Sequence, residues 1–105
     1  MTTRPAVLTS EYVAKGWCQF AMAVDAKGHG CLENDPRAVA WCILGAGSAS
    51  LGGMSGEQWQ PWWKAATKLL GRPDGLAPWN NAPERTQAEV VAFAQAVEKK
   101  LGWLA

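Results

Sequence analysis

The residue types best suited to covalent chemistry in this chain are its cysteines and its only histidine. Cys18 would be a nucleophile if His29 accepted the thiol proton, with Asp25 or an asparagine orienting the imidazole ring. That set predicts a small cysteine-dependent hydrolase or transferase. The competing interpretation treats Cys18 and Cys42 as packing residues and His29 as an exposed turn residue, because free cysteines are among the most buried residue types. No nucleophile-elbow motif accompanies the set, so the packing interpretation is favoured.

Cysteine and histidine are also zinc ligands, and the candidates are Cys18, His29, Cys31 and Cys42. Structural zinc sites normally draw their ligands from closely spaced pairs, and neither a cysteine knuckle nor a second histidine is present. We therefore expect no metal site. The glycine-rich stretch GAGSASLGG, residues 45–53, lacks the Lys-Ser/Thr pair of a phosphate-binding loop, so we expect no cofactor there.

A second candidate site is the polar turn PWNNAPERT, residues 78–86, ahead of the last predicted helix. Asn80, Asn81 and Thr86 carry short polar side chains, which stabilise turns and cap helices through local hydrogen bonds. That local role is the favoured interpretation. The functional alternative is a small-molecule or anion site, because free N–H groups at a helix N-terminus attract negative charge. Trp79 would then stack on the ligand.

Tryptophan is unusually frequent, with seven residues in a chain of 105. They are Trp17, Trp41, Trp59, Trp62, Trp63, Trp79 and Trp103. Each buries on the order of 200 Å² and carries an N–H that needs an acceptor, so a small core is not expected to enclose all of them. Trp62 and Trp63 point about 100° apart on a helix, so one of them, or Trp59, is expected near the surface. Exposed aromatic residues of this kind anchor protein interfaces, but they also complete small cores.

The helices must position these candidates, and the last helix has the clearest sequence pattern. TQAE is a capping box, in which the Thr86 hydroxyl and the Glu89 side chain each satisfy a backbone N–H of the other residue. An apolar stripe follows, and Gly102 ends it. The stripe consists of Val90, Phe93, Ala94, Val97 and Leu101. We predict a helix over residues 87–101.

Two earlier segments also have helical caps and terminating glycines. A short helix is predicted within residues 9–16. A longer one is predicted from Pro36 to Gly45 or Gly47, with a cap from the residues before the proline. Its core-facing positions are Val39, Cys42, Ile43 and Ala46.

A further helix is predicted from Pro61 to Gly71, where glycine provides the C-cap. Its apolar face consists of Trp62, Ala66, Leu69 and Leu70. Residues 48–58 and 72–81 are rich in glycine, serine and proline and are predicted to be loops.

WCQFAMAV, residues 17–24, alternates loosely in side-chain size, and DAKG can turn the chain toward HGCLE, residues 29–33. This pattern predicts a short β-hairpin near residues 17–33; alternatively, residues 18–24 continue the first helix. Without repeats, low-complexity tracts or linkers, the chain is predicted to form one globular domain over residues 1–105. The expected fold class is mainly α, with about four helices.

Composition narrows the classes of function. Ten basic and nine acidic residues give a formal net charge of +1, and the charges are scattered. Nucleic-acid binders concentrate Lys and Arg against phosphates, so we expect no nucleic-acid partner. No apolar stretch approaches the ~20 residues of a membrane-spanning helix, and the N-terminal segment lacks the apolar region of a secretory signal. We therefore expect a cytoplasmic protein without a membrane partner, and the odd number of cysteines indicates reduced thiols.

Three segments of the chain form a recognisable set: KGWCQ at residues 15–19, DPRAVAWCILGA at 35–46 and WNNAPERTQAEVVAFAQAVE at 79–98. Together they resemble an uncharacterised small-protein family of bacterial and phage genomes. The family pattern often has Asn-Asp where this chain has Asn80-Asn81, so a role for that acid does not carry over. The resemblance implies a bacterial or viral intracellular setting, in which small proteins often bind a host component. It implies no activity.

The tryptophan excess, the near-neutral charge and the lack of a catalytic motif favour a non-enzymatic binding or regulatory module. We predict that it contacts a protein partner through exposed aromatic residues around Trp59, Trp62 and Trp79. The alternatives are the cysteine-dependent enzyme and small-molecule binding at the polar turn. The sequence does not indicate the oligomeric state.

Overall fold

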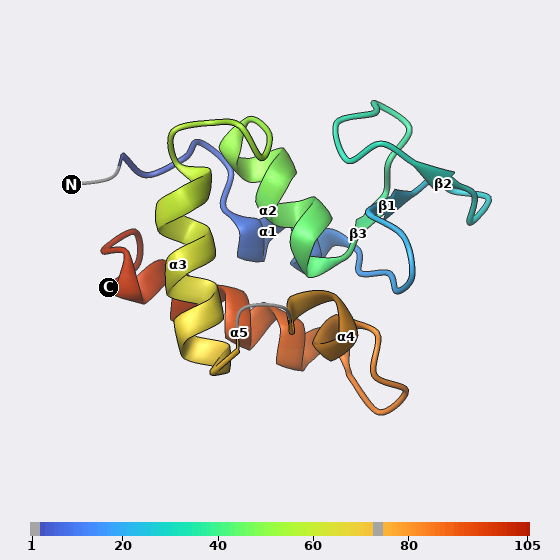
Figure 1. Cartoon of the computed structure of the whole chain (residues 1–105). Coiled ribbons are helices and arrows are strands. Elements are labelled where there is room, and N and C mark those ends of the chain that lie inside the picture. The colour runs from blue at the N-terminus through green and yellow to red at the C-terminus, as the bar shows by residue number, and fades with distance from the viewer. Residues whose placement is uncertain (1–2, 73–74) are drawn as a thin grey trace.

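The structure, a computed structural model, describes residues 3–72 and 75–105. Within them the helices are α1 Thr9–Lys15, α2 Ile43–Leu51, α3 Trp59–Leu70, α4 Leu76–Asn80 and α5 Gln87–Lys100. The short strands β1 Ala23–Val24, β2 Gly30–Cys31 and β3 Ala40–Trp41 form an antiparallel sheet in the order β2-β1-β3. The helices make up the body of the molecule and the sheet stands to one side, away from α3 (Figure 1). The predicted helix-dominated class is confirmed.

α5 begins where its sequence pattern predicts and ends one residue earlier, at Lys100. The Glu89 N–H donates to the Thr86 hydroxyl at 3.2 Å, and the Thr86 N–H donates to the Glu89 carboxylate at 2.9 Å, which forms the predicted capping box. The fully buried residues of the predicted stripe are Val90, Ala94 and Val97. Because α5 packs on α1 and α3, this stripe forms one wall of the core.

α3 begins at Trp59, two residues before the predicted Pro61. Pro61 still lies in the first turn, where its missing N–H breaks no helical hydrogen bond. The helix ends at Leu70 as predicted, and Gly71 follows in the left-handed conformation with a φ of 92°. Gly71 therefore indicates the end of α3 more precisely than Pro61 indicates its start.

The buried face of α3 centres on Trp62, which has no solvent exposure. A β-carbon added to Gly47 of α2 would lie 2.9 Å from the Trp62 ring, so glycine at this position lets α2 approach the indole closely. Ala66 is also fully buried, whereas Leu69, predicted on the same face, is exposed in the last turn of the helix. The contact between α2 and α3 therefore pairs a large residue with a small one.

The predicted helix beginning at Pro36 is wrong. The Asp35 carboxylate accepts from the Arg37 N–H at 2.8 Å and from its guanidinium at 2.9 Å, and these bonds stabilise a turn instead. The chain then forms β3, which pairs with β1. Val39, predicted to face the core, is exposed as a result. The residues that resemble a helix cap form a turn here, and the pairing of β3 with β1 determines the conformation of the residues that follow.

α2 begins at Ile43. Gly45 and Gly47 were predicted to end a helix, but they lie inside this one. The glycine that does end α2 is Gly52, in the left-handed conformation with a φ of 76°. The first part of the predicted loop 48–58 is therefore helical. Gly45 and Gly47 face closely packed neighbours, and this packing outweighs their low helix propensity.

The predicted loop 72–81 contains α4, and its positions 73–74 lie outside the described residues. The predicted hairpin is present in shortened form, with Ala23 opposite Cys31 and Val24 opposite Gly30. β3 was not predicted, and it pairs with the other side of β1. The sheet therefore extends beyond a single hairpin.

The carboxylate of Glu98 joins α5 to α1 and is fully buried. It accepts hydrogen bonds from the Ser10 N–H at 2.9 Å and from the Ser10 hydroxyl at 2.6 Å. Burial raises the pKa of Glu98 above its usual range, and the two Ser10 hydrogen bonds offset only part of this shift. The folded state therefore binds the Glu98 proton more tightly than the unfolded state. Glu98 favours folding below its ordinary pKa, and this contribution is lost as pH rises through the raised pKa.

We expect Glu98→Gln to remove this pH dependence. The amide keeps an acceptor for the Ser10 N–H and can donate to the Ser10 hydroxyl, while the buried charge is gone. The stability of the variant relative to wild type should therefore increase as pH rises through the raised pKa of Glu98. Urea unfolding between about pH 4 and about pH 8 measures both free energies. A difference that stays constant over this interval would contradict the effect of burial on Glu98.

Candidate functional site

Asn80, one of the predicted site residues, is 1% exposed at the end of α4. Its side-chain oxygen accepts from the Trp17 indole N–H and from the Ile43 backbone N–H, both at 2.9 Å. Its side-chain nitrogen donates to the Cys18 carbonyl at 3.1 Å and to Asn81 Oδ1 at 3.0 Å. The amide therefore joins α4 to the first turn of α2 and to the segment after α1. All four of these bonds lie within the protein, so Asn80 is a structural link and not a free ligand donor.

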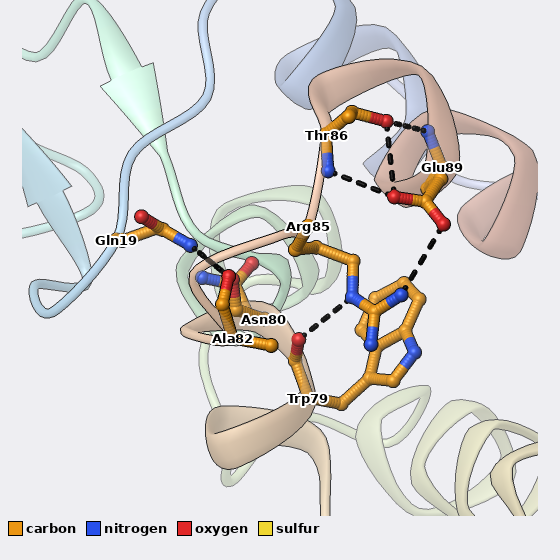
Figure 2. A network of polar contacts seen from close by, with 7 residues as sticks. All are labelled: Gln19, Trp79, Asn80, Ala82, Arg85, Thr86 and Glu89. Carbon is orange, nitrogen blue, oxygen red and sulfur yellow. Dashed lines mark hydrogen bonds and ion pairs between the residues drawn. The ribbon is translucent and has the colours of Figure 1, made fainter.

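Two more side chains fix the segment after α1 to the end of α4. The Gln19 side-chain nitrogen donates to the Asn80 carbonyl at 3.0 Å and to the Ala82 carbonyl at 2.9 Å, and Figure 2 shows Gln19 reaching this turn. Asn81 Oδ1 accepts from the Phe20 backbone N–H at 2.9 Å. We call the residues that meet here the Asn80 corner: 17–20 and 80–82.

Phe20 has a strained backbone in this corner. Its φ is 67°, and no other residue of the described chain except glycines has a positive φ. This left-handed region is costly for a bulky residue, and the hydrogen bond to Asn81 helps to hold it. The Phe20 side chain is nevertheless 79% exposed. Strained conformations of this kind cost about 1–3 kcal/mol, and they cluster at functional sites.

Phe20 stands at the edge of a pocket of about 350 Å³, which we call the Phe20 pocket. Its other lining residues are Ala21, Met22, Cys42, Leu44, Ala77, Asn80 and Asn81. None of these side chains carries a formal charge at neutral pH, and most are apolar. Ligand pockets usually have volumes of roughly 300–1,000 Å³. The Phe20 pocket is therefore large enough for one apolar side chain or for a small apolar molecule.

The remaining polar residues of the predicted turn are used locally. Thr86 caps α5 with Glu89, and Glu89 also pairs with Arg85 at 3.3 Å (Figure 2). Arg85 Nε donates to the Trp79 carbonyl at 2.9 Å, and its guanidinium lies 4.3 Å from the centre of the Trp79 ring. The Phe93 ring lies 4.7 Å from the same indole, measured between ring centres. Trp79 thus already has a cation and an aromatic ring against it.

All four indoles predicted at an interface belong to the core or pack at its edge. Trp59 and Trp62 are buried, whereas Trp63 and Trp79 are half-buried. Trp59 packs on both neighbours in α3, at 5.2 Å from Trp62 and 6.0 Å from Trp63 between ring centres. The expectation that one indole of this group lies nearer the surface is met by Trp63.

Cys18 is not linked to the other two residues of the cysteine-enzyme hypothesis, His29 and Asp25. No hydrogen bond joins Cys18 to His29 within the described residues; the Cys18 thiol donates to a backbone carbonyl at 3.6 Å. His29 lies in the β1–β2 turn, with its Nδ1 4.0 Å from the Asp25 carboxylate. Burial, with a smaller contribution from the nearby Cys42, raises the pKa of Cys18 to about 11. An activated nucleophile needs the opposite shift.

We therefore expect Cys18 to react slowly with alkylating reagents near neutral pH. Only the thiolate reacts, and a pKa of about 11 leaves roughly one thiol in ten thousand ionised at about pH 7. Iodoacetamide labelling followed by peptide mass spectrometry should show slower modification of Cys18 in the folded protein than in the urea-unfolded chain. Faster labelling in the folded protein would contradict the packing role and support the hydrolase or transferase.

Within residues 3–72 and 75–105, no group of three or more His, Cys, Asp and Glu side chains is arranged to hold a metal ion. None of the helices in these ranges combines the length and the apolar character of a bilayer-spanning segment. All three cysteines are free thiols.

Sequence reasoning missed Trp17, Gln19 and Phe20 as members of the site. Their hydrogen-bond partners at the end of α4 lie 61 to 63 positions away in the chain, so no local pattern indicates them. One weak signal was present: Gln19 is a polar residue within an otherwise apolar stretch, and a buried amide requires partners.

Comparison with known proteins identifies the family. A model described as a family of unknown function (DUF6197) matches residues 8–100. The match runs from the start of α1 to the end of α5 and includes the whole Asn80 corner, so the chain belongs to this family. The resemblance to an uncharacterised family is confirmed. No curated protein and no solved structure matches the chain.

Proposed function

We propose that this member of a family without an assigned activity is a non-catalytic binding module that holds an apolar side chain of a protein partner in the Phe20 pocket. The observation that carries the proposal is Phe20 itself, a large aromatic side chain that is 79% exposed on a strained backbone. Neither property stabilises the isolated chain, because a buried ring would gain hydrophobic free energy and a glycine would relieve the strain. Both properties become useful when a partner covers the ring.

The surroundings of Phe20 support this role. Aromatic side chains that a partner encloses contribute a large share of binding energy at interfaces. The bonds from Gln19 and Asn81 hold the Phe20 segment before binding, which lowers the entropy cost of association. We centre the proposed surface on Phe20 and not on Trp59 or Trp62, because those two indoles are buried.

We extend the proposal to a cytoplasmic setting in a bacterial or phage system. The free state of the three cysteines supports a reducing compartment. The partner would then be a protein of the host cell, as the sequence resemblance implies.

Replacing Phe20 by glycine is expected to abolish partner binding without loss of stability. Relief of the left-handed strain offsets the extra chain entropy of glycine, so the free energy of unfolding should change by less than about 1 kcal/mol. Affinity purification from an extract of the native host, with wild type and F20G as paired baits, measures binding. The partner is a protein that wild type retains and F20G does not.

Leu32→Ser is the matched control for this experiment. Leu32 is also a large exposed side chain, at 69%, but it follows β2 and does not line the Phe20 pocket. This variant should retain the same partner as wild type. If F20G retains every protein that wild type retains, or if L32S loses the same protein, the proposed role of Phe20 is wrong.

A second candidate is the binding of a small apolar molecule in the same pocket. Its uncharged and mostly apolar lining favours such a ligand. Thermal unfolding in the presence of small aromatic and aliphatic compounds tests this candidate, because a ligand that binds only the folded state raises the Tm. The increase should be smaller in F20G, and an equal increase in both proteins would place the ligand elsewhere.

A further inference from the structure

A second surface of the molecule carries charge of one sign. At the C-terminal half of α3 there is a shallow hollow of about 360 Å³. Its lining residues are Lys64, Thr67, Lys68, Gly71 and Arg72. Residues 58–72 contain no acidic residue, and the flanking acids in the sequence are Glu57 and Asp74. The net charge of the whole chain is only +1, but positive charge is concentrated at this end of α3.

Many of the carboxylates are engaged elsewhere in the fold. Those that accept hydrogen bonds from backbone or side-chain donors are Glu11, Asp25, Glu33, Asp35, Glu89 and Glu98. Within residues 3–72 and 75–105, the basic residues that form ion pairs are His29, Arg37 and Arg85. The cations of the α3 hollow thus have no carboxylate partner in this part of the chain.

Stabilisation of the helix end accounts for only one of these cations. Positive charge is favourable in the last turn of a helix, and the effect decays within that turn. Lys68 is the basic residue in the last turn of α3. Lys64 lies one turn earlier and Arg72 lies beyond the C-cap Gly71, so this effect does not apply to them.

The Arg72 side chain lies over Gly75. A β-carbon added to Gly75 would lie 2.3 Å from Arg72 Nε and 2.7 Å from Arg72 Cγ, so the arginine arm passes directly over the glycine. The φ of Gly75 is −99°, which any residue adopts, and a β-carbon there would meet only the flexible arginine arm.

We propose that the α3 hollow binds an extended acidic segment of a protein. Lys64 and Lys68 are about 6 Å apart along the helix axis, and alternate side chains of an extended chain are about 6.6 Å apart. Carboxylates at alternate positions of such a segment therefore meet successive cations, and Arg72 adds a planar donor for another carboxylate. Nucleic-acid binding grows with the number of phosphates neutralised, and three cations are few for that purpose. None of these residues lines the Phe20 pocket, so the inference is independent of the proposed function.

A synthetic peptide of alternating glutamate and serine tests this inference. An alternating lysine and serine peptide and an oligothymidylate of equal negative charge are the comparison ligands. Isothermal titration calorimetry at low ionic strength should show binding of the acidic peptide, weakening as salt is added. The double variant Lys64→Gln/Lys68→Gln should bind the acidic peptide roughly tenfold more weakly.

Lys99→Gln/Lys100→Gln is the matched control, because it removes the same charge from exposed residues at the end of α5. This variant should bind the acidic peptide nearly as well as wild type. Equal weakening in the two double variants would show that only net charge matters and would overturn the inference. Absence of acidic-peptide binding to wild type, or tighter binding of the oligothymidylate, would also overturn it.

Discussion

Replacing Asn80 by alanine is expected to lower the free energy of unfolding by about 4 kcal/mol. The substitution strands the Trp17 indole N–H, the Ile43 N–H and the Cys18 carbonyl, which all bond to the Asn80 amide. A buried polar group left without a partner costs about 1–3 kcal/mol. Small domains are stable by roughly 5–15 kcal/mol, so the variant should lose a large part of its stability. Urea unfolding followed by tryptophan fluorescence measures the loss.

Asn34→Ala is the matched control for Asn80→Ala. Asn34 is exposed, and the same substitution there should change the free energy of unfolding by no more than about 0.5 kcal/mol. A loss below about 1 kcal/mol in Asn80→Ala would mean that water replaces the amide and that the Asn80 corner is not a structural centre.

Gly45→Ala is expected to destabilise the protein by about 3 kcal/mol or more, although alanine is the better helix former. Gly45 lies inside α2, and a β-carbon there would be 1.9 Å from the Met22 carbonyl oxygen and 2.7 Å from the Met22 carbonyl carbon. Both atoms belong to the backbone, so no side-chain rotation relieves the clash. Thermal and urea unfolding of the variant measure the effect.

The control for Gly45→Ala lies in the same helix. Ala49→Gly should destabilise by about 1 kcal/mol, because the change affects mainly helix propensity at a half-buried position. If Gly45→Ala stabilised the protein, helix propensity would determine the effect of the substitution, and the close approach of α2 to Met22 would be refuted.

The stability of the Asn80 corner and the proposed binding at Phe20 are physically coupled. The amides of Asn80 and Asn81 fix the segment after α1, and that segment carries the strained Phe20. A variant at Asn80 would therefore lose binding because the segment is released. Substitution of Phe20 itself separates the two effects, since the ring is exposed and its removal costs little packing.

The parts of the fold that were predicted correctly rest on short-range interactions. The capping box of Thr86 and Glu89 lies within one helical turn, and the stripe through Val90 and Val97 repeats with the helical period. Gly71 ends α3 because a left-handed residue is needed next to the last turn. Each of these signals is complete within a few neighbouring residues.

The candidate site was predicted only in part. Asn80 and Asn81 were identified as unusual, but their expected role was a local turn or a ligand contact. The structure instead uses Asn80 to connect three segments that are distant in sequence. The proposed binding surface is therefore centred on Phe20 and not on the tryptophans of α3, because Trp62 is buried and fills the space opposite Gly47.

The sequence by itself determined the helix-dominated class, the terminal helix with its cap, and the end of α3, because these follow from hydrogen bonds and apolar spacing within a few turns. Only the tertiary structure decided that a strand, β3, follows the turn at Pro36, that Gly45 lies inside α2 and that Phe20 is held in a left-handed conformation. Those outcomes depend on contacts between segments far apart in the chain. Local propensity differs by about 1 kcal/mol per residue, and such contacts are strong enough to override it.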